Sequence, residues 1–267
     1  MANFAFGNLD RASRDAAAPA VPPAAYTVEE LDARYAQPAA TSDQMDRMSY
    51  EDTIAKTFAG FVVLLLGAAI GWFVPVLALP AALVGFALAL VNTFKKKPSA
   101  VLVLAYSAVE GVFVGGISHA YAYVWDGIIP VAVFGTLGVV AVTLALFASG
   151  KVRASARATK VFLVALLGYA AFSLVNLGLM VFGVTDSFNG IRDTPLLFGI
   201  PLGVILGVVV VLLAAYSLVL DFDHIKRGVE AGAPRAYGWT GAFGIIVTVV
   251  WLYLEILRLV SYFMPRN

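Results

Sequence analysis

Between Thr57 and Phe94 the chain reads TFAGFVVLLLGAAIGWFVPVLALPAALVGFALALVNTF, which is 38 residues without Asp, Glu, Lys or Arg. A helix crosses the hydrocarbon core of a bilayer in about 20 apolar residues. The stretch is therefore too long for one membrane span and long enough for two. Pro75 and Pro80 lie near its middle, where we expect them to break the helix and form a short turn.

Further apolar runs continue outward from this pair to the end of the chain. They are Pro98–Trp125 with Glu110 as its only charge, Gly127–Gly150, Val161–Thr185, Thr194–Leu220, and Ala236–Leu254, whose apolar pattern continues to about Phe263. These runs show neither the polar face of a soluble helix nor the alternation of a β-barrel strand. The composition agrees, with 61% hydrophobic and only 13% charged residues.

The sequence thus predicts an all-α integral membrane protein with seven transmembrane helices. The expected spans are 55–74, 77–94, 100–123, 128–149, 160–183, 197–222 and 239–263.

Lys and Arg are distributed unequally among the predicted loops. Ten of them lie in the loops after the second, fourth and sixth spans: Lys95, Lys96, Lys97, Lys151, Arg153, Arg157, Lys160, Lys226, Arg227 and Arg235. The other three loops together contain only Arg192. Since short cytoplasmic loops carry the excess of Lys and Arg, we expect a cytoplasmic N-terminus and a C-terminus on the outer side.

The first 47 residues are rich in Ala, Pro and Asp and cannot bury a core, so they predict a disordered cytoplasmic tail. The first apolar run begins near residue 54, too late for a signal peptide. Ser49 and Asp52 have the spacing of a helix N-terminal capping box, which predicts a helix leading into the first span. We therefore expect a membrane domain over 48–263 and a short C-terminal tail over 264–267.

Five ionisable residues lie within the spans or at their ends: Glu110, Asp221, Asp223, Glu255 and Arg258. An ionised side chain at the bilayer centre costs about 2.5–3.5 kcal/mol on insertion scales, so such residues face the bundle interior or a water-filled cavity. Glu255 either pairs with Arg258, one turn further along the same helix, or faces the bundle axis. Asp221 and Asp223 point about 200° apart on a helix, and Asp221 lies deeper in its span.

Glu110 precedes Gly111 and Gly115, whose spacing predicts a small-residue face for close helix packing. Glu110 either lines a vestibule or hydrogen-bonds a neighbouring Ser or Tyr. We expect His119 and His224 to be structural residues near the membrane interface.

Two carboxyl groups that meet on neighbouring helices cannot both ionise cheaply, so they share a proton. Asp221 and Glu255 are the candidates for such a pair, with Asp223 in reserve. Protonated, the pair would hold two helices together. Ionised, it would repel, open the contact and attract a divalent cation, which prefers oxygen ligands. The pair would then be both a gate and a cation site, switched by pH.

At these residues the sequence resembles the Bax inhibitor-1 family, also called the transmembrane Bax-inhibitor-motif family, and most resembles its bacterial, actinobacterial branch. The segments that carry the resemblance are Met48–Thr57, Tyr106–Ser118, Leu220–Ile225, Gly228–Pro234 and Trp251–Val260. The resemblance implies six helices around a central, C-terminal seventh and location in the plasma (inner) membrane of a bacterium.

The resemblance also implies a pH-sensitive calcium leak, with an acid pair on the last two helices as sensor. Asp221 matches the first acid, with Ile225 four residues on and Leu220 in place of the family's Tyr. Glu255 stands where the family has Asp, in Leu252-Tyr-Leu-Glu255.

Three other functions are alternatives to a leak channel: an exchanger, a regulator of membrane proteins and a hydrolase. A proton-coupled cation exchanger would use the same acids, and a regulator of other membrane proteins, such as a membrane protease, is neither supported nor excluded. A hydrolase is disfavoured because the chain has no Cys, no His in mid-span and no Gly-x-Ser-x-Gly or His-Glu-x-x-His motif. We expect no enzyme activity, no cofactor, no structural metal site and no nucleic-acid partner. The expected partners are the lipid bilayer, calcium or other cations, and protons, and we expect a monomer.

Overall fold

The computed structural model describes residues 46–185 and 187–266, and this part of the chain is almost entirely helical. Seven helices are long and apolar enough to cross a membrane. They are α4 (Tyr50–Phe73), α5 (Ala78–Phe94), α6 (Ala100–Val124), α7 (Ile128–Ala148), α8 (Ala156–Val181), α9 (Leu202–Glu230) and α10 (Gly238–Ser261). The predicted seven-span, all-α membrane architecture is confirmed. Its orientation in a membrane stays a prediction.

The turn between α4 and α5 confirms one of the two predicted proline breaks. Pro75 begins a short 3₁₀ turn, η1 (Pro75–Leu77), and ends the first helix. Pro80 instead lies in the first turn of α5, where a backbone N–H has no partner within the helix and a proline is tolerated.

Both ends of α9 differ from the predicted span 197–222. A two-residue strand pair, β1 (Pro195–Leu197) and β2 (Ile200–Pro201), precedes the helix and turns at Phe198 and Gly199, both with positive φ. At its other end α9 continues to Glu230, so that Asp223 lies on a helix rather than at its end. The start of the helix was predicted wrongly because an apolar hairpin and an apolar helix have the same hydropathy. Its end was predicted wrongly because the helix continues past the apolar run, through the charged residues up to Glu230.

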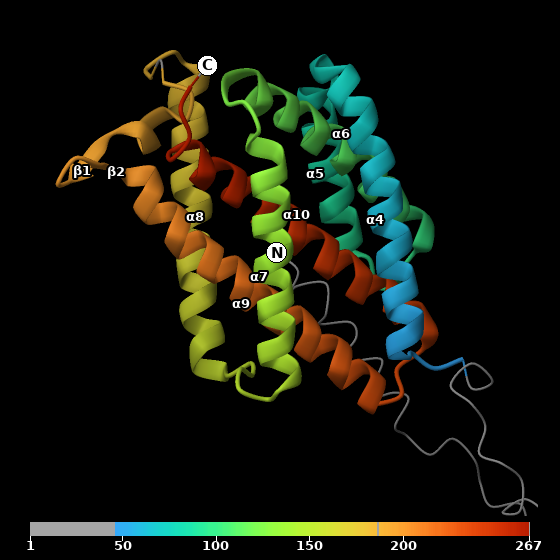
Figure 1. The fold of residues 1–267 in the computed structure, drawn as a ribbon. Coiled ribbons are helices and arrows are strands. Elements are labelled where there is room, and N and C mark those ends of the chain that lie inside the picture. Colours follow the sequence, from blue (N-terminus) through green and yellow to red (C-terminus); the bar gives the residue numbers. More distant parts are fainter. Residues whose placement is uncertain (1–45, 186, 267) are drawn as a thin grey trace, which may run out of the picture.

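Helix α10 lies at the centre of the bundle. Figure 1 shows it crossing the middle of the molecule, with α4, α5 and α6 on one side and α7, α8 and α9 on the other. It packs against α4, α6, α7 and α9 and is the most buried of the seven helices. The expected arrangement around a central C-terminal helix is thus confirmed.

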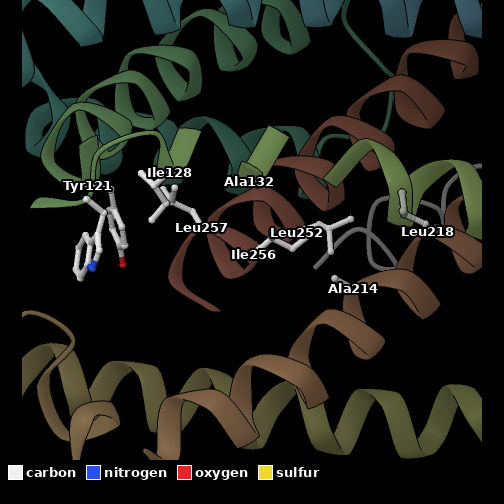
Figure 2. Packing of buried hydrophobic residues seen from close by; sticks show 9 residues of the cluster. Tyr121, Ile128, Ala132, Ala214, Leu218, Leu252, Ile256 and Leu257 are labelled. Atoms are coloured by element: carbon white, nitrogen blue, oxygen red, sulfur yellow. The ribbon is translucent and has the colours of Figure 1, made fainter. Parts of the chain in front are cut away.

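Two hydrophobic clusters hold α10 from opposite sides. One joins it to α6, α7 and α9, and its residues, shown in Figure 2, include Tyr121, Ile128, Ala132, Ala214, Leu218, Leu252, Ile256 and Leu257. The other joins it to α4 and α6 through Leu64, Val103, Tyr106, Val114, Phe243, Ile246 and Val250. Polar side chains on α10 are therefore placed between helices and not toward lipid.

Helices α4 and α6 pack with their backbones in close approach. A Cβ added to Gly115 would lie 2.0 Å from the carbonyl oxygen of Ala68, and one added to Gly111 would lie 2.1 Å from that of Leu64. No side chain fits into such a contact, so the predicted small-residue face of α6 is confirmed, with α4 as its partner.

The segment before α4 is bound to the connection between α9 and α10. The Met48 N–H donates to the Ala233 carbonyl oxygen at 2.7 Å, and the Arg235 N–H donates to that of Asp46 at 2.8 Å. Ser49 caps α4 by accepting from the Asp52 N–H, which is one half of the predicted capping box. The Asp52 carboxylate accepts from Lys56 and Arg235 instead of from the Ser49 N–H. The predicted disordered tail covers residues 1–47, and residues 1–45 of it lie outside the described part of the chain.

Candidate functional site: two separate carboxyl contacts of the central helix

Glu255 is buried at the interface of α10 with α8 and with the loop between α8 and α9. Its side chain is 1% exposed, and both of its oxygens are occupied. Arg192 donates to Oε1 at 3.0 Å, while Arg258 and the Tyr169 hydroxyl donate to Oε2 at 2.6 and 2.5 Å. The carboxylate thus accepts three hydrogen bonds, two of them from guanidinium groups.

Arg192 reaches this site from η2 (Gly190–Asp193), a 3₁₀ turn in the α8–α9 loop. Its side chain is 3% exposed and donates a second set of hydrogen bonds, to the Tyr169 hydroxyl at 2.9 Å and to the Ser173 hydroxyl at 3.1 Å. Its guanidinium also lies over the rings of Tyr169 and Phe172, at 5.1 and 5.4 Å from their centroids. A loop cation is therefore inserted between two membrane-spanning helices, α8 and α10.

Two buried asparagines hold the η2 turn in place. Asn176 of α8 accepts from the Ile191 N–H at 2.8 Å and donates to the Asn189 carbonyl oxygen at 3.1 Å. Asn189 accepts from the Tyr121 hydroxyl of α6 at 3.1 Å. Gly190 has φ +66°, and a Cβ there would lie 2.3 Å from Asn176 Oδ1, so only glycine fits at this position of the turn.

Asp221 lies at a different interface, between α9 and α10. Its side chain is fully buried, and its Oδ2 accepts from the Thr248 hydroxyl of α10 at 2.7 Å. Thr248 also contacts the Ser217 hydroxyl at 3.3 Å. Asp221 Oδ1 has no hydrogen-bond partner among residues 46–185 and 187–266. A buried carboxyl group is thus held by one hydroxyl, without a bonded cation.

The structure does not bring Asp221 and Glu255 together as a hydrogen-bonded pair, which corrects the shared-proton geometry for this conformation. Thr248, the α10 partner of Asp221, precedes Glu255 by seven residues, or about 10 Å at 1.5 Å per residue. The alternative prediction for Glu255, an ion pair with Arg258, is present instead. The physical reason is that α10 places the two contacts two turns apart.

Asp223, the reserve candidate, forms an ion pair with Arg227 on the same helix and lies partly exposed. Neither aspartate of α9 contacts Glu255. Among the described residues no group of three or more His, Asp or Glu side chains could hold a metal ion. The predicted calcium site near Asp221 and Glu255 therefore has no preformed acidic cage in this conformation.

Glu110 lies on α6 beside α5. A Cβ added to Gly85 of α5 would lie 2.8 Å from Glu110 Oε2, so the glycine leaves room for the carboxyl group. Of the two alternatives predicted for Glu110, the hydrogen bond to a neighbouring Ser or Tyr is not formed within the described part of the chain. Glu110 is thus separate from both Asp221 of α9 and Glu255 of α10.

The two histidines occupy local packing positions. His119 packs edge-on against Trp72 with ring centroids 5.3 Å apart, and His224 Nδ1 lies 2.6 Å from the Leu220 carbonyl oxygen.

Sequence reasoning missed Arg192, Tyr169 and Thr248 as partners of the two acids. Arg192 was counted only as a loop charge. Two features of the sequence could have singled out Arg192. It is the one cation in the three predicted outer loops, and it closely follows Asn189 and Gly190, a turn-forming pair. Hydroxyl partners such as Tyr169 and Thr248 leave no trace in a charge or hydropathy pattern.

The fold and the site define a polytopic α-helical membrane protein whose last helix lies at the centre and carries buried carboxyl contacts on two interfaces. The family model described as Bax inhibitor 1 like matches residues 16–265, and the chain belongs to that family. No curated protein matches the chain. The family resemblance seen in the sequence is confirmed, whereas the bacterial branch and the bacterial plasma membrane stay predictions.

Proposed function

We propose that this protein is a pH-sensitive cation leak channel, permeable to calcium, in which Asp221 is the sensor. The observation that carries the proposal is the contact between the buried Asp221 carboxyl group and Thr248 across the α9–α10 interface. Glu255 has two guanidinium partners at its own site and is therefore neutralised independently.

The chemistry of the contact supports a gate. A protonated Asp221 needs no cation and can hydrogen-bond Thr248, which holds α9 against the central helix. An ionised Asp221 places a charge in an apolar interface, where no charged side chain of the described residues is bonded to it. Uncompensated buried charge is costly, so ionisation favours separation of the helices and entry of water or a cation. Flux should therefore rise with pH.

Calcium uptake by liposomes tests this proposal. The full chain is reconstituted with a calcium dye inside the vesicles, and uptake is measured between about pH 5 and pH 8, the range in which buried carboxyl groups and histidines control many proteins. Asp221→Asn should give low uptake that no longer depends on pH. Asp223→Asn is the matched control, because its ion pair with Arg227 lies at the helix surface, and it should behave as wild type.

Unchanged pH dependence in Asp221→Asn would overturn the proposal. A pH dye inside the same vesicles separates a leak from coupled transport. An obligatory counterflow of protons with calcium would indicate an exchanger that uses the same carboxyl group.

A further inference from the structure

The loop between α7 and α8 carries positive charge that no acidic side chain compensates. Residues 127–185 contain no Asp or Glu, and their only Lys and Arg residues are Lys151, Arg153, Arg157 and Lys160. All four side chains are exposed, and none of them forms an ion pair within residues 46–185 and 187–266. Arg157 also lies in the first turn of α8, at the positive end of the helix dipole, where an acidic residue is favoured. The loop therefore presents four cations without a counter-charge from the described chain.

Uncompensated charge is not general at this end of the bundle. Four cations of α4, α9 and the α9–α10 connection lie at the same end, and each of them has an acidic partner. Lys56 and Arg235 bind Asp52, Arg227 binds Asp223, and Lys226 binds Glu230. The lack of an acid is therefore a property of the α7–α8 loop itself.

The backbone that carries the four cations is fixed to its neighbours. The chain turns at Gly150, which has φ +73°. Ser155 caps α8 by accepting from the Ala158 N–H at 3.2 Å. The Tyr216 hydroxyl of α9 lies 3.1 Å from the hydroxyl of Thr159. A ligand of this loop would therefore have to order side chains only, which lowers the entropic cost of binding.

The surface next to the cations is apolar. Val161 and Val164, in the turn of α8 that follows Lys160, are 70% and 73% exposed, and Leu144 of α7 is 48% exposed. Both helices are among the seven that are apolar enough to cross a membrane, and Figure 1 shows the loop joining their ends. Positive charge thus lies directly beside a surface that lipid acyl chains cover.

We infer that the α7–α8 loop binds the phosphate of an anionic phospholipid, whose acyl chains lie along α7 and α8. A phospholipid joins an anion to apolar chains, which matches the neighbouring charged and apolar surfaces, whereas a free phosphate would use the cations alone. Each cation near an anionic headgroup contributes roughly fivefold in affinity. Because Tyr216 connects the loop to α9, the bound lipid would hold α8, one of the least buried spans, in place beside α9.

Native mass spectrometry of the detergent-solubilised full chain tests this site without reference to transport, because each bound lipid adds its own mass. The probes are phosphatidylglycerol and phosphatidylcholine with identical acyl chains, of which only the first has a net negative charge. The wild type should bind phosphatidylglycerol more tightly. Arg153→Gln combined with Arg157→Gln should weaken that binding roughly 25-fold, about fivefold for each cation, and leave phosphatidylcholine binding unchanged.

A matched double variant removes the same charge from the same end of the bundle. Lys226→Gln combined with Arg227→Gln replaces two cations that already have acidic partners, so phosphatidylglycerol should bind as it does to the wild type. Equal weakening in both double variants would indicate an effect of net charge alone and would overturn the site. Equal affinity of the wild type for the two lipids would overturn it as well.

Glycerol 3-phosphate distinguishes a lipid from a soluble phosphate. At equal concentration and ionic strength it should not displace phosphatidylglycerol, because it has no acyl chains. Displacement would assign the cations to a soluble phosphate and overturn the lipid site. All four substituted side chains are exposed, so the lipid-free melting temperatures of both double variants should stay close to that of the wild type.

Discussion

Replacing Glu255 by Gln removes the charge that two guanidinium groups share. Three hydrogen bonds end on this carboxylate, and Arg192 and Glu255 are 3% and 1% exposed. Removing one partner of a buried ion pair costs about 3–5 kcal/mol, because the remaining charge is left uncompensated. Arg258 is 28% exposed, so solvent screens part of the uncompensated charge, and we expect the lower end of that range.

A double-mutant cycle with Arg192→Gln isolates the contact. Arg192→Gln alone should cost about 1.5–3 kcal/mol, because Arg258 still neutralises Glu255. The double variant should be more stable than the sum of the two changes predicts, with a coupling of about 1–3 kcal/mol. The measurement is the apparent melting temperature in detergent, which falls by roughly 2–4 °C per kcal/mol for a domain of this size.

The control for this cycle is Asp223→Asn, which removes an ion pair with Arg227 at the helix surface. Exposed pairs contribute about 0–1 kcal/mol, so its melting temperature should hardly change. If Glu255→Gln lowers the melting temperature no more than Asp223→Asn does, Glu255 is not the centre of a stabilising charge cluster and the reasoning is refuted.

Two further substitutions test the helix contacts. Gly115→Ala places a methyl group 2.0 Å from a carbonyl oxygen of α4 and should cost about 1–3 kcal/mol through forced separation of the helices. Gly138→Ala, on α7 with nothing within 4 Å, should leave the melting temperature unchanged or raise it, and equal effects of the two would contradict the close α4–α6 packing. Thr248→Val removes only a hydroxyl and should destabilise by about 1–3 kcal/mol at neutral pH, because buried Asp221 loses its one donor. Ser217→Ala, whose hydroxyl contacts Thr248 rather than Asp221, should have a smaller effect in the same melting assay, and a larger one would contradict this assignment.

The membrane spans were predictable because charge is expensive in lipid and the seven apolar runs are long. Close packing of α6 was predictable as well, since Gly111 and Gly115 lie on one helix face. The hairpin before α9 was not, because Pro195–Pro201 is as apolar as a span. Hydropathy shows which segments are apolar enough to lie in lipid. It does not show where the chain turns within an apolar segment.

The partners of the two acids could be predicted only in part. Glu255 and Arg258 are one helical turn apart, so their ion pair follows from sequence spacing. The separation of Asp221 from Glu255 depends on how far α9 is shifted along α10, which no residue pattern encodes. The insertion of Arg192 depends on a loop that folds back between helices. From the sequence alone, an arginine in a loop is expected to be exposed to solvent.

The position of α10 bears on how the molecule is made. Ribosomes deliver the helices in order, and apolar segments enter the bilayer one by one before they associate. The innermost of the described helices is therefore inserted after the other six, and although α4 and α6 can already pack against each other, the faces of α4, α6, α7 and α9 that contact α10 stay uncovered until then. A nascent chain stalled before residue 238 would therefore carry six inserted helices without the helix that fills the core between them.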